Sequence, residues 1–388
     1  MEIQQLYSKD YDQIFRLSQF AFQYKLTEEA LIKKKEEADR HIIWGWMDKE
    51  RLAAKLHLIP LSVYINGKTF KMGGISSVST WPEYRRNGMV KQLLSHALNH
   101  MKENGQMVSY LHPFSVPFYR KFGWEIAFNE KHYTIPTEKL QRNWEADGYV
   151  RRVEADIELL HPIYSEFALK FNGMLTRDKK WWEQRILTED ELVAVCYNTN
   201  DEADGYMIYT VKDNLLQVEE LVYNSLNSWK LLLEFIANHD SMAKEVKMTV
   251  SENDNLPLLV NEPRFKQENA PYFMARIVDV LAFLKEFPFE QVPGTSLVIH
   301  VEDIFLPENG GFYWINQMNG NTRVSHQHDN STEMVDISCT VQQLAALLFG
   351  YKRPLEFYRA GLIQGNDETM VHLEKLIPDR QTFFSDFF

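Results

Sequence analysis

The chain has 388 residues, and at roughly 150 residues per domain this length predicts two or three domains. Its 42 basic and 54 acidic residues give a formal net charge of −12, which argues against nucleic acid as the main partner because phosphate binding requires a basic face. The same charge suits a cationic ligand better. With 17 glycines, 14 prolines and 45% hydrophobic residues, the composition excludes a large disordered tract and supplies apolar side chains for several cores.

The sequence gives no indication of secretion, membrane insertion or a metal site. No basic segment followed by an apolar one opens the chain, and no apolar run reaches the roughly 18 residues of a membrane span. We therefore expect a cytoplasmic protein without membrane contact. Cys196 and Cys339 fall in apolar segments and are expected to be small buried side chains, while His326 and His328 lack a clear third ligand, so no metal is expected. The glycosylation sequon at 330–332 has no secretory context.

The first 148 residues predict an α/β layered domain. Two helices are expected before residue 40, the second with Thr27 as its N-cap. An antiparallel meander follows, in which Asn66-Gly67 between two apolar runs indicates a hairpin because both turn residues need positive φ. Apolar residues at 3.6-residue spacing predict an amphipathic helix over 88–101. Strands are expected at 41–47, 51–65, 69–80 and 106–112, with a short helix before Gly123 and another strand after it.

A second unit, from 149 to 287, echoes the order of the first. Its basic–aromatic run 177–185 favours a packed helix with lysines reaching solvent over a nucleic-acid patch. The segment 253–271 is interpreted as loop and 288–294 as a linker, after which a third unit contains another meander, an Asn319-Gly320 turn and two helices. Further helices are expected near 158–171, 228–238 and 278–287, and strands at 191–197, 205–212, 215–223 and 246–250.

The most informative stretch joins the strand that ends near Thr80 to the helix that begins at Gly88. Arg85 and Arg86 place positive charge just before a helix N-terminus, whose exposed N–H groups and dipole favour an anion. Gly88 lets the backbone approach a ligand closely. The combination predicts a polyphosphate site, although the spacing alone fits a solvated basic turn equally well.

Two segments resemble the acyltransferases of the GNAT superfamily. Arg85-Arg86-Asn87-Gly88-Met89-Val90 resembles their pyrophosphate loop, Arg/Gln-x-x-Gly-x-Gly/Ala, with Val90 in place of a small residue. The segment 115–124 resembles the family's FYxKFGF/W element, which carries a tyrosine near the coenzyme sulfur. Over essentially all 388 residues, the chain is similar to the Eis-type (enhanced intracellular survival) N-acetyltransferases.

The Eis-type resemblance implies an α/β fold of three domains. These are a GNAT catalytic domain (1–148), a second GNAT-like mixed-sheet domain without a coenzyme site (149–287), and a sterol-carrier-like domain (288–388) that supplies the C-terminus. Members of the group tend to form hexamers, so a homo-oligomer, by analogy a hexamer, is expected.

The resemblance also implies direct transfer of an acetyl group from acetyl-CoA to a primary amine, such as an aminoglycoside or a polyamine-like cation. Tyr119 is implied to protonate the CoA thiolate as general acid, and the terminal carboxylate of Phe388 to act as general base, with Asp386 as a second carboxylate. The backbone N–H of Val78 is expected to polarise the thioester carbonyl. The implied coenzyme contacts are Val78, Ser79, Thr80, Arg85, Arg86, Asn87, Gly88, Met89, Val90, Lys91 and Ser115.

Four aromatic residues are candidates for the wall of an amine pocket, because aromatic faces attract cations. They are Phe20, Phe22, Tyr24 and Trp81.

Other interpretations stay open at this level. Without its motif Tyr119 would be read as a core tyrosine, Ser115 as a helix N-cap, and Phe387-Phe388 as a hydrophobic plug. A non-catalytic lipid- or metabolite-binding protein with a degenerate GNAT domain is the alternative function, against which the intact loop and Tyr119 favour the enzyme. Transfer of a longer acyl group is a third possibility, because tertiary packing sets the size of an acyl pocket.

Overall fold

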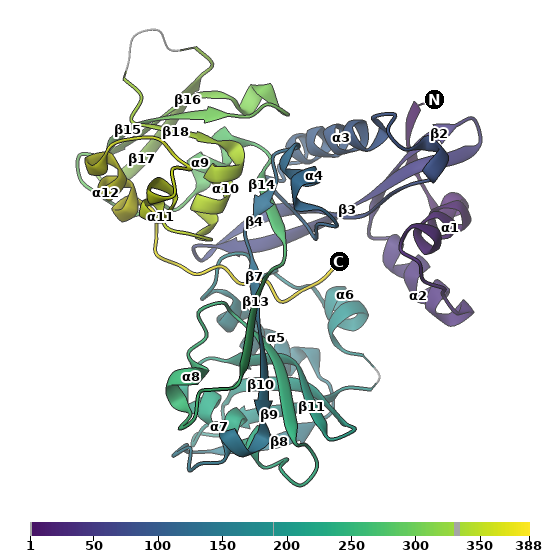
Figure 1. Cartoon of the computed structure of the whole chain (residues 1–388), viewed down its shortest axis with the longest axis vertical. Helices are drawn as coiled ribbons and strands as arrows, with labels where there is room; N and C mark the ends of the chain where they lie inside the picture. Colours follow the sequence, from purple (N-terminus) through teal and green to yellow (C-terminus); the bar gives the residue numbers. More distant parts are fainter. Residues whose placement is uncertain (1, 189, 330–333) are drawn as a thin grey trace. The chain divides into compact units, whose positions relative to one another are not determined.

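The structure, a computed structural model, describes residues 2–188, 190–329 and 334–388, so the sequon at 330–332 lies outside the described residues. The chain divides into two compact units, whose elements are labelled in Figure 1. Unit 1 comprises the residues up to Ala127, then Phe273–Arg380 and Phe387–Phe388. Unit 2 comprises Phe128–Tyr272 and Gln381–Asp386.

Unit 1 contains a seven-stranded mixed sheet. In spatial order its strands are β1 (Glu2–Leu6), β2 (Ile42–Asp48), β3 (Arg51–Ile65), β4 (Lys68–Thr80), β5 (Val108–Leu111), β14 (Met274–Ile277) and β6 (Glu125–Ile126). β4 and β5 pair in parallel, and the other neighbours pair antiparallel. β14 comes from far along the chain and pairs with both β5 and β6.

Helices cover both faces of this sheet. The β3–β4 hairpin has the predicted turn, with φ of 48° at Asn66 and 77° at Gly67. On one face α3 (Met89–Glu103) packs against β2, β3 and β4 through the apolar stripe that predicts it. On the other face lies α1 (Tyr11–Ala21), followed by α2 (Glu28–Ala38), which Thr27 caps as expected (Figure 1). The short helix α4 (Val116–Arg120) follows β5.

A second sheet in unit 1 has four strands, in the order β17 (Asn321–Gln327), β16 (Gly311–Met318), β15 (Ser296–Glu302) and β18 (Ile337–Thr340). The Asn319-Gly320 turn joins β16 to β17 with positive φ at both residues, as predicted. The accompanying helices are α9 (Val280–Glu286), α10 (Val341–Phe349), α11 (Pro354–Arg359) and α12 (Asp367–Leu376). α10 ends at Gly350, whose φ of 84° supplies the left-handed C-cap.

Unit 2 is built on a seven-stranded sheet with the order β13 (Lys266–Pro271), β7 (Asn129–Pro136), β12 (Glu245–Val250), β11 (Leu215–Tyr223), β10 (Ala203–Lys212), β9 (Leu192–Tyr197) and β8 (Tyr149–Val153). α7 (Leu226–Ala237) and α5 (Ile157–Ala168) both pack against β10 and β11. α6 (Lys179–Trp181) runs into a helical turn at Trp182–Ile186, and its two tryptophans are buried, which confirms the packed-helix interpretation of the basic–aromatic run. The remaining helix is α8 (Leu256–Leu259).

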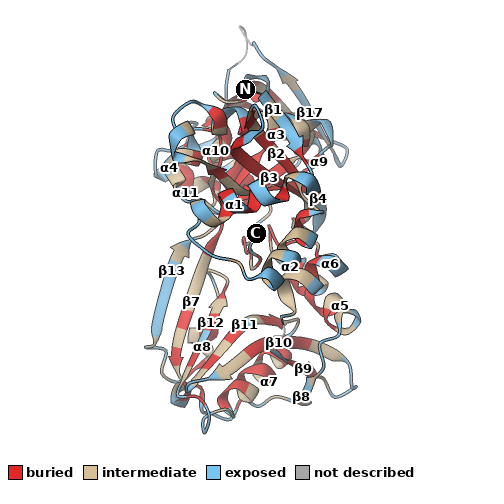
Figure 2. Cartoon of the chain, turned by 90° about the vertical axis from the view of Figure 1, so that its right-hand side faces the viewer, coloured by how far each residue is buried: buried red, intermediate tan, exposed pale blue. Residues whose placement is uncertain are grey.

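The structure differs from the sequence expectations mainly in its edge strands and in strands that pair with partners far away in the sequence. β1 lies where only helices were expected, and β13 lies in a segment interpreted as loop. β13 is an exposed edge strand of polar residues, visible as such in Figure 2, so it carries no apolar alternation to mark it. β7 belongs to unit 2 and β14 to unit 1, so residues 128–148 lie in unit 2 and residues 273–287 in unit 1. Among the described residues, no helix has the length and apolarity needed to span a membrane.

Candidate active site

β4 loses its pairing with β5 halfway along its length. The parallel pairing covers residues 72–75. Just beyond it Ser77 takes a φ of 52°, a left-handed conformation that non-glycine residues rarely adopt, and the register with β3 shifts at the same place. Within the described strands, residues 78–80 therefore have no partner on the β5 side. Their backbone groups are available to an extended ligand that adds to the sheet as a strand would.

A cavity of about 680 Å³ lies beside this part of β4, within the size range of small-ligand sites. Its wall comes from the end of α1, the end of β4, the loop before α3 with the first turn of that helix, and phenylalanines around α4. The structure thus brings together every residue predicted to contact the coenzyme except Ser115: Val78, Ser79, Thr80, Arg85, Arg86, Asn87, Gly88, Met89, Val90 and Lys91.

The N-terminus of α3 opens into this cavity without a capping side chain. Gly88 occupies the N-cap position at a φ of 74°, and the first turn contains no acidic residue. A Cβ built on Gly88 meets no atom within 4 Å, so the space next to the helix end is open. Uncapped N–H groups, the positive end of the helix dipole and two arginines on the same wall make an electropositive site suited to a phosphate group.

Tyr119 lies on α4, one layer of side chains behind the cavity wall. Its side chain is only 3% exposed, and its ring centroid lies 5.2 Å from that of Phe118 and 5.5 Å from that of Phe114, both of which line the cavity. Burial raises the pKa of the Tyr119 hydroxyl above its ordinary value. The phenol therefore stays protonated through the neutral range, as a proton donor requires.

The other candidate residues are distributed around this site. Ser115 stands at the N-cap position of α4, although its side chain makes no capping hydrogen bond. Phe22 lines the cavity, and Phe20 packs on Trp81 with ring centroids 4.8 Å apart. Tyr24 is 37% exposed, and a hydrogen bond with Ser18 partly offsets the rise in its pKa that burial causes.

The last residues of the sequence belong to both units. In unit 1 the ring of Phe388 is buried over Gly74 of β4 and beside Phe273, with ring centroids 5.1 Å apart. In unit 2 Asp386 is buried and bound to the Arg177 guanidinium at 3.0 Å and to the indole N–H of Trp181 at 2.7 Å. This structural pairing makes Asp386 a poor candidate for a general base.

The histidine and cysteines that the sequence does not assign to a metal or catalytic site have structural roles. His326 lies with Nε2 2.9 Å from the Gly310 carbonyl oxygen and stacks on Tyr313. Cys196 and Cys339 are buried, as expected. Across the part of the chain that the structure describes, no three or more His, Cys, Asp or Glu side chains are grouped so that they could hold a metal ion.

Five residues that line the cavity were not predicted from the sequence: Ala21, Tyr84, Phe114, Phe118 and Phe122. The three phenylalanines recur at intervals of four residues, a spacing that could have indicated one shared face around α4. Tyr84 carries no such pattern. Its position comes from a hydrogen bond, in which its hydroxyl donates to Asp48 at 2.8 Å.

Comparisons with known protein families agree with this geometry. Two acetyltransferase (GNAT) domain families match residues 2–127 and 173–277, and a sterol carrier protein domain family matches residues 280–385. An uncharacterized N-acetyltransferase of Streptomyces griseus is 25% identical over 318 residues, covering 74% of each chain.

Solved structures match the whole chain. A probable N-acyltransferase of unknown function from Enterococcus faecalis V583 superposes with a TM-score of 0.93 at 25% identity, covering 100% of this chain and 99% of that one. Eis1 from Mycobacterium abscessus shares the fold, with a TM-score of 0.83 at 20% identity over 100% of both chains. The chain therefore carries two GNAT acetyltransferase domains and a sterol carrier-like domain on a mixed α/β fold, and it is an acyltransferase of the GNAT type.

Proposed function

We propose that this protein is an Eis-type enzyme that moves an acetyl group from acetyl-CoA directly to a primary amine of a small cationic molecule, such as an aminoglycoside or a polyamine. The observation that carries the proposal is the cavity of about 680 Å³ that joins the unpaired part of β4 to the uncapped, arginine-flanked N-terminus of α3. A pyrophosphate fits the helix end, and an extended pantetheine arm fits the unpaired strand.

The residues of the cavity wall, together with Tyr119 behind it, suggest a division of tasks. Arg85, Arg86 and the N–H groups at the start of α3 bind the pyrophosphate. The backbone N–H of Val78 stabilises the thioester oxygen as negative charge develops on it. As the amine nitrogen bonds to the carbonyl carbon and the C–S bond breaks, Tyr119 donates its proton to the departing thiolate.

The amine enters from the aromatic side of the cavity. Phe22 lies on the wall. Phe20 lies on α1, Tyr24 in the segment after α1, and Trp81 directly after β4. Their faces attract a cation by up to about 2 kcal/mol where it is desolvated. The net charge of −12 also favours the approach of cationic substrates over anionic ones.

Release of CoA against a panel of amines tests this proposal. Aminoglycosides, spermidine and a lysine peptide are each incubated with acetyl-CoA and the protein, and free thiol is measured. We expect thiol release with at least one polyamine-like cation, and mass spectrometry should find one acetyl group added per CoA released. A panel with no release above the rate of spontaneous hydrolysis would favour the binding-protein alternative.

Four further expectations from the sequence stay predictions. The domain boundaries after residues 148 and 287 can be tested by limited proteolysis. A hexamer can be tested by light scattering, and a cytoplasmic location by cell fractionation. The role of the Phe388 carboxylate as general base can be tested by replacing it with an amide through semisynthesis, which should lower kcat while the Kd for acetyl-CoA is unchanged.

A further inference from the structure

A chain of polar side chains runs through unit 1 behind the cavity wall. Lys55 and His57 alternate along β3 with Leu56 and Leu58, which pack in the core on the α3 side, so both polar residues point to the opposite face of the sheet. Lys55 is 0% exposed and His57 is 4% exposed. Two titratable side chains that are buried next to each other on one face of a strand need a reason to be there.

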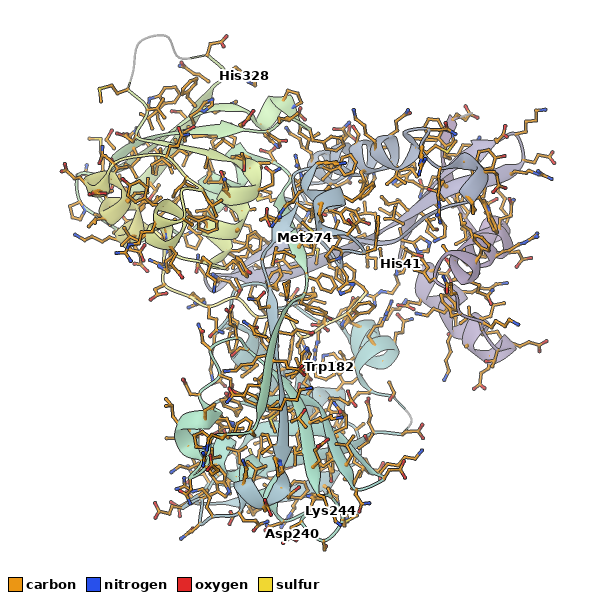
Figure 3. All side chains as sticks on the ribbon, viewed as in Figure 1. His41, Trp182, Asp240, Lys244, Met274 and His328 are labelled. Carbon is orange, nitrogen blue, oxygen red and sulfur yellow. The ribbon has the colours of Figure 1, made fainter. Side chains whose placement is uncertain are left out.

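The contacts of these two residues form a continuous line. Lys55 Nζ lies 2.6 Å from Ser77 Oγ and 3.2 Å from His57 Nε2, and it donates to the Ser77 carbonyl oxygen at 2.8 Å. At the other side of the imidazole ring, His57 Nδ1 lies 3.1 Å from His41 Nδ1. His41, labelled in Figure 3, comes just before β2 and is partly exposed.

The inner end of this line meets the cavity wall. Ser77 is the bulged residue of β4 and directly precedes residues 78–80, which line the cavity. Its hydroxyl also lies 3.3 Å from that of Ser18 on α1, and Ser18 shares a hydrogen bond with Tyr24 of the candidate amine pocket. Polar groups thus connect the place where the amine is expected to the partly exposed His41.

The charge state of Lys55 suits transport of a proton. Within the described residues no carboxylate pairs with Lys55, and the nearby α2 contributes Lys34, itself paired with Glu37. Burial lowers the pKa of Lys55 to about 7, and burial together with Lys55, His41 and Lys34 lowers the pKa of His57. A lysine that changes its charge near neutral pH can accept a proton and pass it on, and imidazole accepts at one nitrogen while releasing from the other.

We propose that Lys55, His57 and His41 form a proton relay that carries a proton of the substrate ammonium from the Ser77 bulge to solvent. This inference rests on the proposed function. The nitrogen of R–NH₃⁺ loses two protons when it becomes R–NH–COCH₃. One of them is taken by the Phe388 carboxylate and restores the proton that Tyr119 gives to the CoA thiolate, and the other is released. The relay takes the released proton from the ammonium to Lys55 through the Ser77 hydroxyl, then through His57 to His41 and water.

The test compares the pH dependence of kcat, with both substrates saturating, in the wild type and in three variants. His57→Gln keeps a hydrogen-bonding side chain but cannot pass a proton, and His41→Gln does the same at the partly exposed end, where misfolding is less of a concern. His96→Gln is the matched control, because His96 lies on α3, on the other face of the sheet, beside Trp44. Added imidazole serves as an external proton carrier.

We expect His57→Gln and His41→Gln to lower kcat at pH 7 by at least tenfold. The loss should shrink towards pH 9, where more of the amine arrives unprotonated, and imidazole should restore turnover in His41→Gln. His96→Gln should keep the wild-type profile.

Two results would overturn the relay alone: wild-type kcat in both histidine variants, or a loss that neither pH nor imidazole relieves, which would mean that the residues only support the bulge. A wild type that releases no CoA with any amine would instead overturn the proposed function and the relay with it.

Discussion

Gly88 offers the sharpest test of the phosphate site, because the same helix carries its own control. Gly88 precedes α3 at a φ of 74°, and Gly105 follows the helix at a φ of 70°. A Cβ built on either glycine meets no atom within 4 Å. Replacing either one by alanine therefore costs only the strain of the left-handed backbone, about 1–2 kcal/mol, without a steric clash inside the protein.

The two variants should differ in ligand binding. Gly88→Ala shifts the N–H groups at the start of α3 and places a methyl group beside the cavity, so it should cost the coenzyme one charge-assisted hydrogen bond, about 1.5–3 kcal/mol. At 1.4 kcal/mol for each factor of ten, the Kd for acetyl-CoA should rise by roughly 10- to 150-fold. Gly105→Ala carries the same backbone strain, so it should lower the melting temperature about as much as Gly88→Ala does, but it should leave this Kd unchanged. Gly88→Asn should fall between the wild type and Gly88→Ala, because asparagine tolerates positive φ better.

Isothermal titration calorimetry with acetyl-CoA measures the Kd, and thermal unfolding measures the stability. Wild-type affinity in Gly88→Ala would refute the assignment of the helix end to the pyrophosphate. An equal loss of affinity in Gly105→Ala would show that general loosening of α3, and not the loop, weakens binding.

Three further predictions concern single side chains. Tyr119→Phe should lower kcat about 100-fold or more and leave the Kd for acetyl-CoA unchanged. Because burial raises the pKa of Tyr119, the kcat of the wild type should not fall between pH 8 and 10. A fall of wild-type thiol release in that range would contradict the assignment of Tyr119 as general acid. Arg86→Ala should raise the KM for acetyl-CoA about tenfold, whereas Arg16→Ala, at an exposed position outside the cavity, should leave it unchanged. Equal KM values for the two variants would exclude Arg86 from the phosphate site. Asp386→Ala should lower the free energy of unfolding of unit 2 by about 1–3 kcal/mol, because the buried indole N–H of Trp181 loses its acceptor while Arg177 keeps its ion pair with Glu220. An unchanged midpoint in a denaturant titration would refute that coupling.

Local signals in the sequence were enough to predict the coenzyme side of the site. The loop before α3, its glycine and the amphipathic helix follow from residues within about 20 positions of one another, and their contacts are local too. The Asn66-Gly67 turn likewise fixes the β3–β4 register from two residues.

Pairings between strands that lie far apart in the sequence could not be predicted from such local signals. β14 is a buried four-residue strand, Met-Ala-Arg-Ile, and nothing in those residues tells which sheet receives it. Lys55 and His57 did leave a signal, since both interrupt an apolar strand. That signal gains a meaning only when Ser77 and His41 are brought beside them by the fold.

The pairing of β14 with β5 also sets a condition on how the protein is made. β5 ends at Leu111 and β14 at Ile277, so about 165 residues are synthesised before the edge of β5 can be covered. At roughly 5–20 residues per second, a ribosome needs on the order of 10–30 s for that length. During this time the nascent chain exposes a strand edge made of Val108, Ser109, Tyr110 and Leu111, all of which are buried in the finished protein. Nascent chains of this protein should therefore depend on holdase chaperones more than their final stability would suggest.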